Sequence, residues 1–330
     1  MKFRSKDFCC QLICIFCVLA FAGSVGYAQG YPTRGIDIVI PNAAGGGSDN
    51  FYRTAQPYLS KELGVPINIV NRAGGGGVIG TSFVANSKPD GYTLFAHSVT
   101  GFLTPQIISP KTIPYDVLKD FTPIVFTVYE PLILVARPDL GVKTFKEFIA
   151  FAKKNPGKLV CGVSGLGSPN RIDLEILKTV ANVNIRHISF DSGAETLTQL
   201  LGGHIDWIIG TIPVSKPHIQ IGKLRALAVL STERLPEFPD VPTMIEEGYP
   251  DVNVNMEYIL MGPKSLPPEI TKKLANAMQT VLKKPEMITA MKRRGYVDRF
   301  LPPKEFSDHL VKTFNRYNEI AKKTPGMITE

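Results

Sequence analysis

The chain has 330 residues, a formal charge of +8 and 44% apolar side chains, a composition that supports a packed core and excludes an intrinsically disordered protein. Its length exceeds what one hydrophobic core usually holds, so two domains are expected. The basic residues are spread along the chain rather than gathered with aromatic residues, which argues against a nucleic-acid partner and is compatible with a small anionic ligand.

The N-terminal segment has the three-part layout of a secretory signal peptide. Lys2, Arg4 and Lys6 precede an apolar run over 12–21, and small residues follow up to Ala28. The apolar run is shorter than the roughly 18 to 20 residues that a membrane-spanning helix needs. We therefore expect residues 1–28 to form a signal peptide cleaved near Ala28, and the remaining chain to be a soluble protein of the periplasm.

The cysteines and histidines predict neither a disulfide nor a metal site. Four of the five cysteines lie in the predicted leader, which leaves Cys161, expected to be a buried apolar filler. The five histidines lack metal-ligand spacing, so no metal or other cofactor is expected. Ser164 with His187 has the composition of a nucleophile and its base, but Ser164 lacks the G-x-S-x-G turn, and we predict no catalytic residue and no enzyme.

Short apolar strands alternate with helices along the first part of the chain. Strands are predicted at 36–40, 67–70 and 93–96, each followed by a turn rich in glycine or hydroxyl residues and then by a helical stretch. This alternation predicts βαβ units on a mostly parallel sheet.

The middle and the tail of the chain continue the same alternation. Strands at 132–135, 159–163, 185–189, 205–209 and 226–230 alternate with helices at 144–154, 170–182 and 194–202, which predicts a second sheet. Three more helices are predicted at about 268–282, 285–294 and 303–322. The last carries Phe306, Leu310, Phe314 and Tyr317 at helical spacing, a stripe typical of core packing.

Proline-containing segments mark two predicted crossings between the domains, at 129–131 and 235–239. They assign residues 29–129 together with 234–330 to one lobe, and residues 130–233 to the other. Because the chain crosses twice, we expect a two-lobed α/β molecule with a hinge.

The segment 41–49 joins a buried strand to a helix and contains three consecutive glycines. Glycines let the backbone approach a ligand closely, and the first N–H groups of a helix stabilise an anion. The segment therefore predicts ligand contacts from Asn42, Ala43, Gly45, Gly46, Ser48 and Asp49. The alternative is a plain turn in which Ser48 or Asp49 caps the helix and no ligand binds.

The segment 71–80 again places glycines between a strand and a helix, and Gly76 and Gly77 are predicted ligand contacts. Gly75, Gly77 and Gly80 match the dinucleotide pattern G-x-G-x-x-G, but the match stands alone and follows the second strand rather than the first. Neither glycine segment ends in Gly-Lys-Ser/Thr, so a nucleotide P-loop is not supported.

Three further segments follow predicted strands and supply hydroxyl groups or helix N-termini. They lie at 97–101, 164–171 and 189–195. The residues predicted to bind the ligand there are His97, Ser98, Gly165, Ser168, Asn170, Arg171, Phe190, Asp191 and Gly193.

Specific motifs recur along the chain in a fixed order. They are Tyr31-Pro32, Pro41 with Gly45-Gly46 and Asp49, Asn71-Arg72 with Gly74, Gly76 and Gly80, the run 89–94, and the run 120–124. With the segments 164–169, 202–206 and 239–243, these motifs extend over nearly all of the chain after the leader. In order and spacing the chain resembles the tripartite tricarboxylate transporter substrate-binding proteins, the TctC or Bug family.

The resemblance implies an α/β periplasmic-binding-protein fold of the Venus-flytrap, type II-like kind, with a ligand cleft between two lobes. It implies closure over a small carboxylate held by backbone amides and water, and delivery to the two membrane subunits of a secondary transporter. A monomer is expected. A periplasmic sensor that presents the closed form to a signalling partner would have the same fold and site.

Some positions depart from the family pattern. Asn42 and Ala43 stand where an aromatic residue and a proline are common, and Ala73 and Tyr52 replace a usual proline and a usual small residue. Arg171 stands where histidine is frequent, and we hypothesised that its guanidinium pairs with a second ligand carboxylate. The alternative is a surface arginine that faces water.

Overall fold

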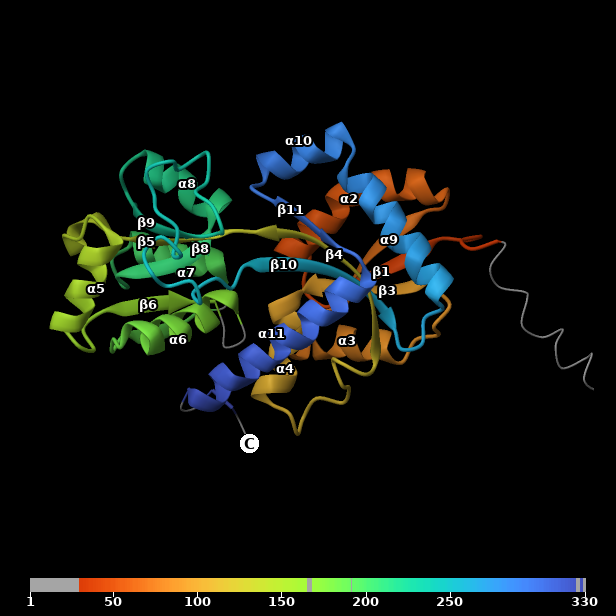
Figure 1. Ribbon diagram of the computed structural model, residues 1–330, viewed down its shortest axis with the longest axis horizontal. Helices are drawn as coiled ribbons and strands as arrows, with labels where there is room; N and C mark the ends of the chain where they lie inside the picture. Colours follow the sequence, from red (N-terminus) through yellow and green to blue (C-terminus); the bar gives the residue numbers. More distant parts are fainter. Residues whose placement is uncertain (1–29, 165–167, 191, 325–326, 329–330) are drawn as a thin grey trace, which may run out of the picture.

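The computed structural model describes residues 30–164, 168–190, 192–324 and 327–328, and their strands form two sheets in two lobes that lie side by side along the long axis (Figure 1). The first sheet contains β1 (Ile36–Ile40), β2 (Ile67–Asn71), β3 (Thr93–Ser98), β4 (Phe121–Glu130), β10 (Met256–Pro263) and β11 (Val297–Leu301). Their order across the sheet is β11-β4-β10-β3-β1-β2. The strand β1 is buried at four of its five positions, which explains its nearly continuous apolar sequence.

The helices of the first lobe pack on this sheet (Figure 1). They are α2 (Gly47–Leu63), α3 (Val78–Ala85), α4 (Val99–Ile108), α9 (Pro268–Leu282), α10 (Pro285–Arg293) and α11 (Pro303–Lys323), with a short 3-10 turn η1 (Gly75–Gly77) before α3. The predicted apolar stripe of α11 is confirmed as core packing, because Phe306, Leu310 and Tyr317 are buried.

The second sheet contains β5 (Leu132–Ala136), β6 (Val160–Val163), β7 (Arg186–Ser189), β8 (Trp207–Thr211) and β9 (Arg225–Leu230), in the order β7-β6-β8-β5-β9. Its helices are α5 (Phe145–Lys154), α6 (Pro169–Ala181), α7 (Gly193–Leu201) and α8 (Ile212–Gln220), and a 3-10 turn η2 (Pro138–Leu140) follows β5. The single cysteine outside the predicted leader, Cys161, is fully buried on β6, as predicted for an apolar filler.

The three strands of the predicted βαβ units are parallel, as expected, but the prediction of a mostly parallel sheet is wrong, since both sheets are mixed. The strand β1 runs parallel to β2 and β3, whereas β10 is antiparallel to β3 and β4. In the second sheet, β6 is parallel to β7 and β8, but β5 is antiparallel to β8 and β9. The first lobe has this geometry because the chain leaves it along β4 and returns along β10, so these neighbouring strands run in opposite directions.

The return crossing lies later than predicted. The segment 234–249 was expected in the first lobe, but it packs against the second sheet. Met244 N donates to Val229 O at 3.0 Å, Phe238 joins the apolar cluster of that lobe, and Tyr249 meets Phe145 with ring centroids 5.4 Å apart. The chain therefore returns between residues 250 and 256.

Two features connect the lobes besides the crossing strands. The helix α11 packs on β4 and α4 of the first lobe and also contacts α6 of the second (Figure 1). The buried carboxylate of Asp173 on α6 accepts a hydrogen bond from Val254 N, at 2.9 Å, in the returning segment. Across the described residues, no helix combines the length and apolar content needed to cross a membrane.

Candidate functional site

A cavity of about 490 Å³ lies between the two lobes. The first lobe contributes residues that follow the carboxyl ends of β1, β2 and β3, and the second lobe contributes Ser164 and Ser168, which follow β6. The described residues that line it are Asn42, Gly75, Gly76, Val78, His97, Gly101, Thr104, Pro105, Ile108, Ser109, Thr112, Ile113, Ser164 and Ser168. We call this space the interlobe cavity.

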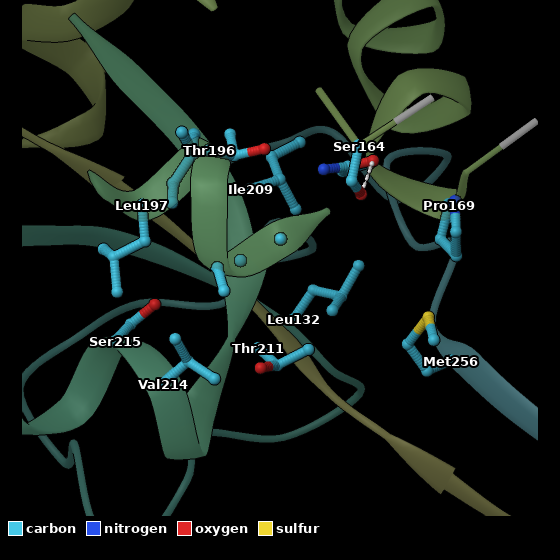
Figure 2. A pocket seen from close by; sticks show the side chains of 15 residues that line it. Leu132, Ser164, Pro169, Thr196, Leu197, Ile209, Thr211, Val214, Ser215 and Met256 are labelled. Carbon is cyan, nitrogen blue, oxygen red and sulfur yellow. Dashed lines mark hydrogen bonds between the residues drawn. The ribbon is translucent and has the colours of Figure 1, made fainter. Parts of the chain in front are cut away.

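A second cavity, of about 220 Å³, adjoins it within the second lobe (Figure 2). Ser164 lines both cavities. The remaining described lining residues come from β8, from the first turns of α6, α7 and α8, and from the two crossing points: Leu132, Pro169, Asn170, Gly193, Ala194, Thr196, Leu197, Ile208, Ile209, Gly210, Thr211, Val214, Ser215 and Met256. We call this space the lobe-2 cavity.

The first glycine loop is held by Asp49 in the first turn of α2. The Asp49 carboxylate is buried and accepts hydrogen bonds from Gly45 N at 2.9 Å, from Arg53 Nε at 2.9 Å and from Asn71 Nδ2 at 3.0 Å. Burial alone raises the pKa of Asp49, but these hydrogen bonds outweigh it and hold the pKa below its usual range. Asp49 is therefore an ionised anchor of the loop, with its carboxylate already occupied.

The second glycine loop has a backbone conformation that glycine adopts more readily than any other residue. Gly74, Gly75, Gly76 and Gly77 all have positive φ, at 133°, 57°, 65° and 96°. The loop also packs directly on the first one, because a Cβ atom at Gly80 would lie 2.8 Å from Pro41 Cα and 2.6 Å from Arg72 O. The two loops thus form one continuous surface beside the interlobe cavity.

His97, at the carboxyl end of β3, lines the interlobe cavity and is only 7% exposed. Burial lowers the pKa of His97 to about 4, so the imidazole is neutral at neutral pH. Its Nδ1 atom has no hydrogen-bond partner within the described part of the chain. A ring edge also faces Gly101 in the first turn of α4, where a Cβ atom would lie 2.4 Å from His97 Nε2.

The second lobe presents hydroxyl and amide groups at the start of α6. Ser164 Oγ donates to Asn170 Oδ1 at 3.4 Å (Figure 2), and Ser168 Oγ also donates to Asn170 Oδ1. The helix α7 starts nearby with Gly193, and Ser192 caps it by accepting from Glu195 N at 3.1 Å. These groups, together with the glycine loops, give the cavities polar contacts without charged side chains among the described lining residues.

Arg171 does not face either cavity. Its side chain is buried on α6, where Nη2 pairs with Glu175 Oε1 at 2.9 Å and Nη1 contacts His187. The alternative of a water-facing arginine is therefore wrong, whereas the hypothesised contact with a second ligand carboxylate stays a prediction, which this pairing disfavours. The reason is the spacing of four residues, which places Glu175 on the same face of the helix.

The structure brings together six of the predicted ligand residues. Asn42, Gly76, His97 and Ser168 line the interlobe cavity, and Asn170 and Gly193 line the lobe-2 cavity. Gly165 and Asp191 lie outside the described residues. The other predicted residues lie in or beside the loops without lining a cavity: Ala43, Gly45, Gly46, Ser48, Asp49, Gly77, Ser98, Arg171 and Phe190.

The sequence interpretation missed the walls contributed by α4 and α8. Thr104 and Ile108 lie one or more turns inside α4, and Val214 lies in the first turn of α8, a helix that the sequence analysis did not predict. For α8 a signal was present, because Thr211 precedes Pro213 in a pattern that starts helices. Within the described residues, no group of histidine, cysteine or acidic side chains is arranged to hold a metal ion.

Two α/β lobes, joined by crossing strands and enclosing a cavity lined by glycine loops and hydroxyl groups, define a solute-binding protein. The family model of the tripartite tricarboxylate transporter family receptor matches residues 51–324. The chain therefore belongs to the TctC receptor family, a family of substrate-binding receptors rather than enzymes.

Relatives of known sequence and structure agree with this family. Protein BugT of Bordetella pertussis is 32% identical over 95% of this chain and 96% of its own length. A solved periplasmic transporter protein is 33% identical, with a TM-score of 0.78 over 89% of this chain and 98% of its own. The R. palustris protein Rpa4515, solved with adipate, is 29% identical with a TM-score of 0.77, over 88% of this chain and 97% of its own.

Proposed function

We propose that this chain is a periplasmic receptor that captures a small organic carboxylate between its lobes and delivers it to the two membrane subunits of a tripartite tricarboxylate-type transporter. The proposal includes the predicted signal peptide, cleaved near Ala28, and a monomeric receptor. Family membership supports it, as do relatives solved with adipate and with malate.

The observation that carries the proposal is the lining of the interlobe cavity. Gly75 and Gly76 offer backbone at its surface, and the neutral imidazole of His97 adds a further polar group. Ser164 and Ser168 bring hydroxyl groups, which would turn from Asn170 to a bound carboxylate. Hydrogen-bond donors of this kind stabilise a carboxylate without a salt bridge. Because donors come from both lobes, a bound carboxylate favours the closed arrangement over the open one.

Carboxylate binding is tested by thermal unfolding and isothermal titration calorimetry with a panel of mono-, di- and tricarboxylates. A ligand present at 100 times its dissociation constant should add about 2.7 kcal/mol to the free energy of unfolding. The matching uncharged amides should add nothing, because they lack the charge that the donors stabilise. A panel in which no carboxylate raises the melting temperature contradicts the proposed function.

A matched pair of variants tests the position of the site. Gly76→Ala and Gly64→Ala both place a Cβ atom at positive φ, 65° and 72°, with nothing within 4 Å of it. Both should therefore destabilise the fold by roughly 1–2 kcal/mol. Only Gly76 lines the interlobe cavity, so only Gly76→Ala should weaken ligand binding, by about tenfold or more. Equal ligand affinities in the two variants would mean that the ligand does not bind at Gly76.

A further inference from the structure

The walls of the lobe-2 cavity are mainly aliphatic. Figure 2 shows Leu132, Leu197, Ile209 and Val214 around the space, with Met256 at one side. The cavity volume of about 220 Å³ corresponds to roughly seven water molecules at liquid density, enough for a ligand segment of similar atom count. The cavity therefore has the size and surface of a site for a short apolar chain or a ring.

The described lining of the same cavity offers no charge to a ligand. Its described lining contains no lysine, arginine, histidine or acidic side chain. Arg171 on the adjoining helix is already paired with Glu175, and the two side chains are only 6% and 5% exposed. A carboxylate inserted among these aliphatic groups would lose its hydration without gaining an ionic partner.

Three helices begin at the cavity, yet they supply few free donors. Proline stands in the first turn of α6 and of α8, at Pro169 and Pro213, and removes one N–H group from each. At α7, Ser192 Oγ already accepts from Glu195 N, and Thr196 Oγ1 donates to Ser192 O at 2.8 Å. Gly193 and Ala194, at the start of α7, line the cavity, and the backbone N–H groups left in this first turn are enough for one ligand carboxylate.

One polar group in the wall is not satisfied within the protein. Ser215 is 1% exposed, and its hydroxyl has no hydrogen-bond partner among the described residues. A single hydroxyl suits an uncharged oxygen atom on a ligand and does not neutralise a carboxylate.

From these features we infer that the ligand of this receptor is a monocarboxylate with an uncharged, largely apolar tail that occupies the lobe-2 cavity, rather than a di- or tricarboxylate. The inference rests on the proposed function, because it assumes that the carboxylate binds between the lobes. It assigns the choice of ligand to the walls formed by β8 and the first turns of α7 and α8.

Three acids with six carbon atoms test the inference directly. Hexanoate, 6-hydroxyhexanoate and adipate have the same chain length and differ only in the distal group. Calorimetric titration of the purified protein should show that both monocarboxylates bind at least tenfold more tightly than adipate. Adipate binding as tightly as hexanoate, or more tightly, overturns the inference while leaving the proposed function intact. If none of the acids in the wider carboxylate panel binds, the proposed function fails as well.

A charge introduced into the wall should reverse the preference. Val214 lines the lobe-2 cavity and is 44% exposed, so Val214→Lys places an ammonium group at the cavity without burying it completely. Ile221→Lys, at the other end of α8 and 66% exposed, is the matched control. We expect Val214→Lys to strengthen adipate binding and weaken hexanoate binding, each by at least tenfold, with no change in the control. Unchanged preference in a folded Val214→Lys protein, checked by its thermal unfolding, also overturns the inference.

Discussion

Glu130 should make the stability of this protein depend on pH in an unusual direction. It is the last residue of β4, where the chain leaves the first lobe, and it is only 6% exposed. Its Oε2 atom accepts a hydrogen bond from Tyr258 OH at 2.9 Å. Burial raises the pKa of Glu130 from 4.5 to about 7, although the Tyr258 hydrogen bond and the positive charge of Arg294 act in the opposite direction.

Stability should fall as the pH rises, because folding favours the protonated form of Glu130. Below pH 4.5 the carboxyl group is protonated in both states, and its contribution to stability is fully present. As the pH rises through 7, the folded protein must ionise a buried group, and that contribution is lost. The difference between 4.5 and about 7 corresponds to roughly 3 kcal/mol, at about 1.36 kcal/mol per pKa unit.

The variant Glu130→Gln removes this titration while keeping an oxygen that accepts from Tyr258. We expect the free energy of unfolding of the wild type, minus that of the variant, to fall by roughly 3 kcal/mol between pH 4.5 and 8. Urea denaturation of both proteins across this pH range measures this difference. Other titrating groups such as His97 contribute equally to both proteins, so their contributions cancel. Glu286→Gln, at an exposed carboxylate on α10, controls for the loss of a negative charge. If the free-energy difference between the wild type and Glu130→Gln does not change with pH, Glu130 does not have the raised pKa argued above.

Three other substitutions have expected outcomes. Tyr258→Phe removes the donor to buried Glu130 and should cost roughly 1–3 kcal/mol in urea denaturation at pH 8; an unchanged midpoint would contradict the role of that hydrogen bond. Asp49→Asn removes the charge that holds the first glycine loop, so stability should fall by roughly 1–3 kcal/mol and calorimetric ligand affinity should fall with it. Arg171→Ala removes one of the two cations paired with buried Glu175 and should cost roughly 3 kcal/mol, while mono- and dicarboxylate affinities change by equal factors; a selective loss for dicarboxylates would instead support the hypothesised ligand contact.

Local chemistry was sufficient to predict most helices and strands. The helix α9 occupies residues 268–282 as predicted, because Pro268 starts it and its apolar periodicity is regular. The helix α8 was missed, since Pro217 lies inside a nine-residue segment and proline argues against a helix interior. Sheet direction was also missed, because the pairing of β4 with β10 joins residues more than 120 positions apart, and no local pattern encodes it.

The candidate site was predictable where backbone conformation determines it. The loop at 74–77 has positive φ at each residue, and four consecutive glycines in the sequence indicate such a conformation. The cavity walls were not predictable, because Val214 and Thr104 reach them only through the packing of whole helices. The buried pairing of Arg171 was missed although its partner was visible in the sequence: Glu175 stands four residues later, a spacing that favours an ion pair along one helix face.

The direct contact between the two glycine loops has a consequence for how new specificities arise in such a receptor. Since a single methyl group at Gly80 would collide with Pro41 and Arg72, the contact between the two loops tolerates little change. Selection for a new nutrient, or a laboratory library built for one, should therefore accumulate substitutions along the starts of α7 and α8. The contact between the glycine loops would then stay constant while the walls formed by α7 and α8 change.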